Sequence, residues 1–294
     1  MGYEREMRDM KKIIAMLLAM LLVLSCFAAC DSAPTADQAG DASNDATQGQ
    51  ETADQNTADD GSDLAFVQEK GKLVVGITDY APMDYKDDNG EWTGFDAEFA
   101  RLFAEELGVE CEFFVLADWG KKIFELDSKN IDCVWNGMTI TEEILVTSSC
   151  SDPYVINAQV IVMKADVVGN YTDIESMKDL TFAVESGSAG EAALNDAGLV
   201  KYVAVQDQGS AVMEVAAGTS DACVIDITMA NAMTGEGTSY ENLTYEVSLT
   251  EEEYGVSFRK GSDLTAKFNE FMAELKADGT LQELAAKYEL TLAE

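Results

Sequence analysis

Histidine is absent from this chain of 294 residues. Its absence removes the commonest general base and the commonest metal-ligating side chain. Catalytic triads of the Ser-His-Asp kind and Cys-His pairs are therefore excluded, although an enzyme that works with carboxylates alone is not. We expect no metal ion and no cofactor.

Basic residues are scarce: 19 Lys and Arg stand against 55 Asp and Glu, which gives a formal net charge of −36. Nucleic-acid binding and electrostatic docking on anionic lipid both need clustered basic side chains, so the charge balance argues against both partners. Such acidity is typical of a secreted protein that its charge keeps in solution. The apolar fraction of 47% is enough for a folded core.

The few basic residues near the N-terminus precede an unbroken apolar run over residues 13–24. A basic segment followed by a short apolar one is the pattern of an export signal. Two alanines stand directly before Cys30, which resembles the lipobox of bacterial lipoproteins. The resemblance implies a signal peptide at 1–29 and lipidation of Cys30, with Cys26 as the alternative site. A secreted protein without lipid and an uncleaved membrane helix are the other readings.

Residues 31–62 contain no Lys, Arg, aromatic residue, Leu, Ile or Val. Such a segment cannot bury enough apolar surface to offset the entropy lost on ordering. We therefore predict that 30–62 is a lipid-anchored, acidic, flexible linker. It would hold an exported domain on the outer face of the cytoplasmic membrane. The folded part has an even number of cysteines, which permits either disulfides or buried free thiols: Cys111, Cys133, Cys150 and Cys223.

From residue 63 the chain alternates short apolar runs, typical of buried strands, with amphipathic segments typical of helices. Asp96 is predicted to cap the first of these helices, and the alternation returns after about residue 158. Repeated strand–helix–strand units predict parallel sheets with helices on both faces, here two α/β lobes with a ligand cleft between them. The predicted strands are 72–77, 112–115, 131–135, 181–184, 203–205 and 221–226; the predicted helices are 97–107, 119–128, 188–197, 210–217, 227–233 and two within 264–290.

Several short motifs follow one another in a recognisable order. They are Gly-Lys-Leu-Val-Val-Gly at 71–76, Gly-Phe-Asp at 94–96, Gly-Met-Thr-Ile-Thr at 137–141, Ser-Asp-Pro-Tyr at 151–154, Glu-Glu-Tyr-Gly-Val at 252–256, Arg-Lys-Gly at 259–261 and Lys-Ala-Asp-Gly-Thr at 276–280. Over nearly all of residues 65–290 the chain thereby resembles the family 3 extracellular solute-binding proteins, which serve amino-acid ABC importers.

The resemblance implies a periplasmic-binding-protein-like fold, with two α/β lobes joined by two crossing strands. Lobe 1 would comprise 63–158 and 247–294, and lobe 2 would comprise 159–246. A ligand that contacts both lobes would close the cleft by a hinge motion. The implied partners are a small molecule, either an amino acid or a related amine, and the permease subunits of an ABC importer. We expect a monomer that acts as a binding protein rather than an enzyme.

An amino acid needs an anion site for its carboxylate, acceptors for its ammonium group and a wall for its side chain. The resemblance implies that Asp226, at a strand end, pairs with the ammonium group; a helix cap is the alternative. Ser188 and Ala189 open a helix whose N–H groups can bind an anion, while Ser188 can also be an ordinary cap. The candidate ligand-binding residues are Asp79, Tyr80, Trp119, Lys122, Gly137, Met138, Thr139, Ser188, Ala189 and Asp226.

One departure from the family pattern concerns the ligand carboxylate. The family usually carries an Arg where this chain has Ile144, and often a Thr where it has Ala189. Either Lys122 replaces the guanidinium group, or the ligand is not an ordinary α-amino acid. Two other functions stay open: a surface sensor lipoprotein, and a dehydratase-like enzyme on the same fold. The enzyme would use cleft carboxylates: Glu142, Glu143, Glu185 and Asp226.

Overall fold

A computed structural model describes residues 61–294. The predicted signal peptide, Cys30 and the linker up to residue 60 lie outside the described residues. Within residues 61–294, no helix is long and apolar enough to cross a membrane.

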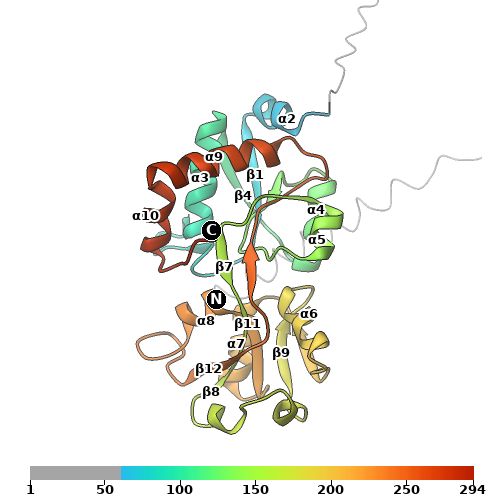
Figure 1. Ribbon diagram of the computed structural model, residues 1–294, viewed down its shortest axis with the longest axis vertical. Coiled ribbons are helices and arrows are strands. Elements are labelled where there is room, and N and C mark those ends of the chain that lie inside the picture. The colour runs from blue at the N-terminus through green and yellow to red at the C-terminus, as the bar shows by residue number, and fades with distance from the viewer. Residues whose placement is uncertain (1–60) are drawn as a thin grey trace, which may run out of the picture. The chain divides into compact units, whose positions relative to one another are not determined.

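The first lobe is built on a five-stranded sheet with the order β4-β1-β5-β14-β6. Figure 1 shows β1 and β4 of this sheet with α3 and α9 beside them. Strands β4, β1 and β5 are parallel, whereas β14 and β6 run antiparallel to their neighbours. The strands are β1 (Lys72–Ile77), β4 (Glu110–Val115), β5 (Cys133–Val134), β6 (Ser149–Cys150) and β14 (Ser257–Phe258), beside a small hairpin of β2 (Tyr85–Lys86) and β3 (Trp92–Thr93). The helices are α2 (Asp63–Lys70), α3 (Phe95–Leu107), the 3-10 turn η1 (Trp119–Lys121), α4 (Lys122–Asp127), α5 (Glu142–Thr147), α9 (Leu264–Asp278) and α10 (Thr280–Lys287).

The second lobe repeats this plan with the strand order β10-β9-β11-β8-β12. Strands β10, β9 and β11 are parallel, and β8 and β12 are antiparallel to their neighbours. The strands are β8 (Gln159–Lys164), β9 (Phe182–Glu185), β10 (Tyr202–Val205), β11 (Ala222–Asp226) and β12 (Leu243–Ser248). The helices are η2 (Val168–Asn170), η3 (Glu175–Met177), α6 (Ala189–Asp196), α7 (Gln208–Ala217) and α8 (Ile227–Met233).

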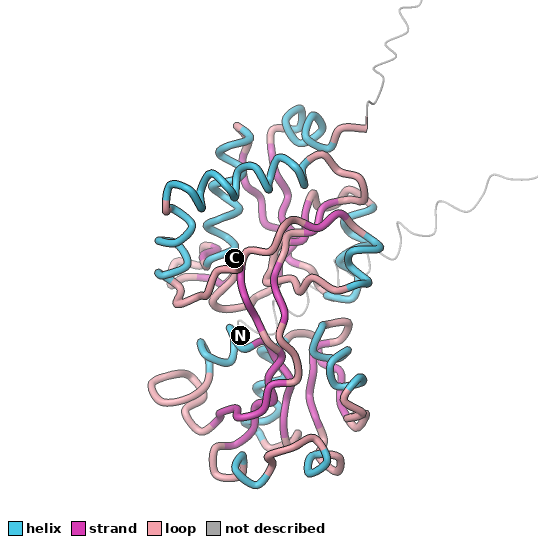
Figure 2. The backbone as a smooth tube through the Cα atoms, in the orientation of Figure 1, coloured by secondary structure: helices cyan, strands magenta, loops and turns pink. Residues whose placement is uncertain are grey.

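Two strands join the lobes: β7 (Val155–Asn157) and β13 (Glu252–Tyr254). They pair antiparallel, with Glu252 opposite Asn157 and Tyr254 opposite Val155. Figure 2 shows both strands passing between the two sheets. The predicted two-lobed α/β fold with crossing strands is therefore confirmed, and the two connections place any hinge at these strands.

Two details of the prediction are wrong. The sheets are mixed rather than parallel, because the chain returns through β14 in one lobe and β8 in the other, and these strands enter antiparallel. Asp96 does not cap α3: the helix begins at Phe95 after Gly94. The Asp96 carboxylate turns inward and accepts hydrogen bonds from the Gly137 N–H at 2.6 Å and the Tyr154 hydroxyl at 2.9 Å. The carboxylate is used to fix a loop rather than a helix end.

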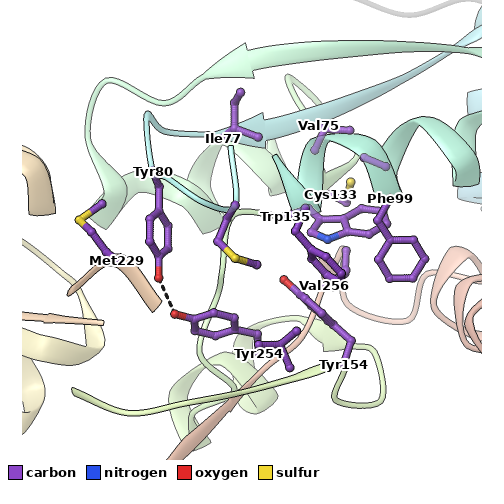
Figure 3. Packing of buried hydrophobic residues seen from close by; sticks show 14 of the residues in the cluster. Val75, Ile77, Tyr80, Phe99, Cys133, Trp135, Tyr154, Met229, Tyr254 and Val256 are labelled. Atoms are coloured by element: carbon purple, nitrogen blue, oxygen red, sulfur yellow. Dashed lines mark hydrogen bonds between the residues drawn. The ribbon is translucent and has the colours of Figure 1, made fainter. Parts of the chain in front are cut away.

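The core of the first lobe is aromatic. The Trp135 ring lies 4.9 Å from the rings of both Phe99 and Phe268, edge to face, and its side chain is fully buried. Figure 3 shows Trp135 packed beside Phe99. Burying each large apolar side chain contributes about 1.5–3 kcal/mol. This packing holds β5, α3 and α9 together, and so fixes the strand end that leads into the loop at 137–139.

A buried ion network ties α2 to the same sheet. The Arg259 guanidinium group lies 2.9 Å from Asp63 and 3.4 Å from Asp132. Asp132, which has no exposed surface, also accepts hydrogen bonds from Lys70 Nζ at 2.5 Å and from the Val74 N–H at 2.7 Å. Removing one member of a buried network like this leaves a charge without a partner, which is strongly destabilising.

Candidate ligand cleft

A cleft of about 560 Å³ lies between the lobes, where the carboxyl ends of the parallel strands face one another. Open α/β sheets bind ligands at this edge. Nine of the ten candidate residues line the cleft: Tyr80, Trp119, Lys122, Gly137, Met138, Thr139, Ser188, Ala189 and Asp226.

Asp79 is the exception, because it is exposed and does not line the cleft. Partial burial, followed by the negative charge of Asp207, raises the pKa of its carboxyl, and Lys86 opposes the rise. Its place beside Tyr80 is therefore peripheral.

Asp226 ends β11 with its carboxylate in the cleft and only 3% of its surface exposed. It stands at the cap position of α8 but makes no capping hydrogen bond. Instead, its carboxylate accepts from the side-chain amides of Asn157 and Gln208, and from that of Gln159 at 2.7 Å. Burial, and next the charge of Glu252, raise the pKa of Asp226 to about 7. The helix-cap alternative is thus ruled out for this side chain.

Glu252 in the crossing strand β13 shares the same amides. Its Oε1 accepts from Asn157 Nδ2 at 2.6 Å, from Gln159 Nε2 at 2.7 Å and from the Thr139 hydroxyl at 2.8 Å. Asn157 and Gln159 therefore bridge two carboxylates, and they connect the cleft floor to both strands between the lobes. The Thr139 hydroxyl is already engaged by Glu252.

The loop after β5 approaches the cleft very closely. Gly137 has φ +57°, in the region that favours glycine, and a Cβ there would lie 2.5 Å from Cε1 of Tyr80. Only glycine fits both requirements. Its N–H is held by Asp96, whose pKa burial raises to about 7. The loop backbone is thus fixed before any ligand arrives.

Aromatic side chains close two parts of the cleft. The Tyr80 hydroxyl forms a hydrogen bond with the Tyr254 hydroxyl (Figure 3). The two oxygens are 2.5 Å apart, and the Tyr80 hydroxyl lies 2.6 Å from Oγ1 of Thr228 in the other lobe. Tyr80 therefore forms part of a buried seam between the lobes. Trp119 is 8% exposed, and the ammonium group of Lys122 lies 4.7 Å from its ring centroid.

Lys122 is the one basic side chain among the described residues that line the cleft. Its Nζ reaches across to the Gly187 carbonyl at 3.3 Å and to the Trp119 carbonyl at 3.4 Å. Burial lowers the pKa of Lys122, and the charges of Glu185 and Glu143 oppose that shift. The lobes thus meet at this side of the cleft.

Ser188 and Ala189 open α6 at the opposite wall. The Ser188 hydroxyl accepts from the Glu191 N–H at 3.2 Å and donates to the Glu185 carbonyl at 2.8 Å, so Ser188 is a helix cap as well as a cleft residue. Ile144, which stands where the family pattern has Arg, is 6% exposed and belongs to an apolar cluster with Val74 and other residues of the first lobe. The part of the cleft wall that contains Ile144, on the first lobe, is therefore hydrophobic.

Several residues that shape the cleft were not among the predicted ligand contacts. Glu185 ends β9 with 5% of its surface exposed, and burial, followed by the charges of Asp226 and Asp207, raises its pKa to about 8. The sequence signal that could have identified Glu185 as a cleft residue is a charged residue directly after a predicted apolar strand. The amide partners of Asp226 gave none, because they lie 18 to 69 residues from it along the chain. The described lining holds one ammonium group, that of Lys122, and five carboxyl groups: Glu142, Glu143, Glu185, Glu191 and Asp226.

Known proteins of one family share this architecture. The model of the bacterial extracellular solute-binding proteins, family 3, matches residues 73–291. The chain belongs to this family. It is 33% identical over 236 residues to the L-cystine-binding protein TcyJ of Escherichia coli, covering 79% of this chain and 87% of that protein. It is 31% identical over 227 residues to the arginine-binding extracellular protein ArtP of Bacillus subtilis, covering 74% and 86%.

Solved structures of other binding proteins are similar to this family member. Holo ArgBP from T. maritima matches with a TM-score of 0.67 and 32% identity, over 72% of this chain and 93% of that one. The ancestral amino acid-binding protein AncCDT-1, a precursor of cyclohexadienyl dehydratase, matches with a TM-score of 0.71 and 32% identity, over 77% and 99%.

Proposed function

We propose that this protein is the solute-binding component of an ABC importer and that its cleft captures a small solute with a cationic amine, most simply an amino acid. The observation that carries the proposal is Asp226, a buried carboxylate at a strand end, fixed by three amides. A buried carboxylate without a cation is costly. A bound ammonium group would supply the missing charge.

The character of the cleft supports the same class of solute. Five carboxyl groups and one ammonium group line it among the described residues, which favours a positively charged molecule over an anion or a sugar. Relatives at about the same identity are named for binding cystine, arginine, or lysine, arginine and ornithine. Capture would proceed by closure of the lobes about β7 and β13, because the residues of the cleft come from both.

We further propose that the mature protein is exported and held on the membrane by lipid at Cys30. The support is the sequence pattern before that cysteine. Replacement of Cys30 by Ala should release the processed protein from membranes, since a lipid chain would supply the attachment. Retention of the processed variant in the membrane fraction would contradict the anchor.

The experiment for the binding function is mass spectrometry of small molecules that co-purify with the protein, followed by thermal unfolding with each amine found and with the common amino acids. A solute that binds only the folded form raises the melting temperature. We expect amine-bearing compounds to do so. Stabilisation by sugars or organic anions, and not by amines, would reject the proposal.

A further inference from the structure

Two buried carboxylates, Glu185 and Asp226, stand side by side at the cleft edge of the second lobe. They end the neighbouring parallel strands β9 and β11, in which Val184 pairs with Val224. This register places Asp226 one residue beyond the position opposite Glu185. Adjacent strands lie about 4.8 Å apart, and both residues line the cleft, so one ligand can contact both carboxylates.

Glu185 differs from Asp226 in its surroundings. The carboxylate of Asp226 accepts hydrogen bonds from three side-chain amides. Glu185 has no such set of donors, and no Lys or Arg of residues 61–294 forms an ion pair with it. The charges that act on Glu185 are those of Asp226 and Asp207, which are negative, and that of Lys122, which is positive and comes from the other lobe. The side-chain amide of Gln208 also favours the charged form of Glu185.

Among residues 61–294, Lys122 forms no ion pair with either carboxylate, although its charge acts on Glu185 from a distance. Its ammonium group lies over the Trp119 ring and is directed to the Gly187 carbonyl. Two carboxylates removed from water repel each other, and each is stabilised by a cation within a few ångströms. One ammonium group on Asp226 would leave Glu185 without a cation in direct contact.

We propose that Glu185 is a second cation-binding residue and that the cleft takes a small dication, with one cationic nitrogen on Asp226 and the other on Glu185. The inference rests on the proposed function and narrows its substrate class. A cleft of about 560 Å³ accommodates a dication with a short aliphatic chain. Such a chain would lie along the apolar wall that contains Ile144.

Dications of this size come from two sources. A dibasic amino acid also carries a carboxylate, for which Lys122 and the N–H groups that open α6 are the available partners. A diamine, or a decarboxylated dibasic amino acid, needs no such partner. Matched pairs separate the sources: lysine with cadaverine, and arginine with agmatine.

The test is calorimetric titration of the purified protein with these four compounds and with two monocationic controls, norleucine and pentylamine, which match lysine and cadaverine without the second cation. Glu185→Gln removes the carboxylate and keeps the shape. Glu246→Gln is the control, since Glu246 is an exposed carboxylate of the same lobe on β12.

We expect the wild type and Glu246→Gln to bind at least one dication ten-fold or more tightly than its monocationic counterpart. In Glu185→Gln that preference should disappear, through loss of dication binding with monocation binding unchanged. Equal binding of dications and monocations by the wild type, or a preference retained in Glu185→Gln, would overturn the inference while leaving amine binding intact. Failure of all six compounds to bind would reject the proposed function together with the inference.

Discussion

Replacing Gly187 with Ala should weaken ligand binding by obstructing closure of the lobes. Gly187 lies between β9 and α6 and faces Gly120 of the first lobe. A Cβ at position 187 would stand 2.8 Å from the Gly120 Cα and 3.2 Å from its N, where unstrained carbon contacts are about 3.5–4.0 Å. The two lobes would have to separate at this point by roughly 1 Å or distort locally. Opening of the cleft would relieve this contact.

The magnitude follows from two separate effects. Gly187 has φ +71°, so Ala there is strained by about 1–2 kcal/mol in both open and closed forms. That effect lowers folding stability but leaves binding unchanged. Overpacking costs about 1–3 kcal/mol and acts on the closed form alone, which corresponds to about 5-fold to 150-fold weaker binding.

Gly198→Ala is the matched control. Gly198 has φ +74°, and no atom lies within 4 Å of the position that a Cβ would take there, so this variant carries the backbone strain without the contact across the cleft. Calorimetry on both variants, with the tightest ligand of the amine panel, separates strain from obstruction. Equal affinity in the two variants, or wild-type affinity in Gly187→Ala, would refute the reasoning.

Three further predictions concern the cleft charges and the core. Lys122→Met should weaken binding of dibasic amino acids by about 1–3 kcal/mol, the scale of a charge-assisted hydrogen bond, and leave their decarboxylated counterparts unchanged; equal losses in calorimetry would contradict this. Cation affinity should rise about ten-fold or more from pH 6 to pH 8, because the pKa values of Asp226 and Glu185 are about 7 and about 8 and a protonated carboxyl offers no charge to the cation; titrations that give one affinity across this range would argue against both residues. Asp132→Asn should lower the free energy of unfolding in urea by about 3–5 kcal/mol, against less than about 1 kcal/mol for Glu112→Gln in an exposed pair; similar losses would show that the Asp132 network contributes little.

The sequence predicts local structure where a pattern is contained in one segment. The run at 72–77 became β1 with the predicted bounds, and Gly108 ends α3 in a left-handed conformation. The mixed sheets could not be predicted in the same way, because β14 enters the first sheet from a segment more than 100 residues after β5. The spacing of apolar residues along a segment indicates which side chains are buried, but it does not indicate the direction in which a strand runs in its sheet.

In the cleft, too, residues with a local sequence signal could be predicted, whereas contacts between distant segments could not. Asp226 could be identified because it directly follows an apolar strand. Its amide partners, Asn157, Gln159 and Gln208, lie 18 to 69 residues away along the chain, and a polar residue in isolation does not reveal which carboxylate it will meet. Asp96 misled the prediction for the opposite reason, because a helix start offers a local use for an acid that the tertiary structure uses elsewhere.

The measurement that tests the account most directly is the affinity of Asp226→Asn for the amine that binds the wild type most tightly. If Asp226 holds the cationic nitrogen, loss of its charge should weaken binding at least about 100-fold, or about 2.7 kcal/mol. The melting temperature of the ligand-free variant should not fall in parallel, because the change removes a carboxylate whose pKa burial has raised. Binding within three-fold of the wild type by a folded Asp226→Asn protein would contradict the central claim.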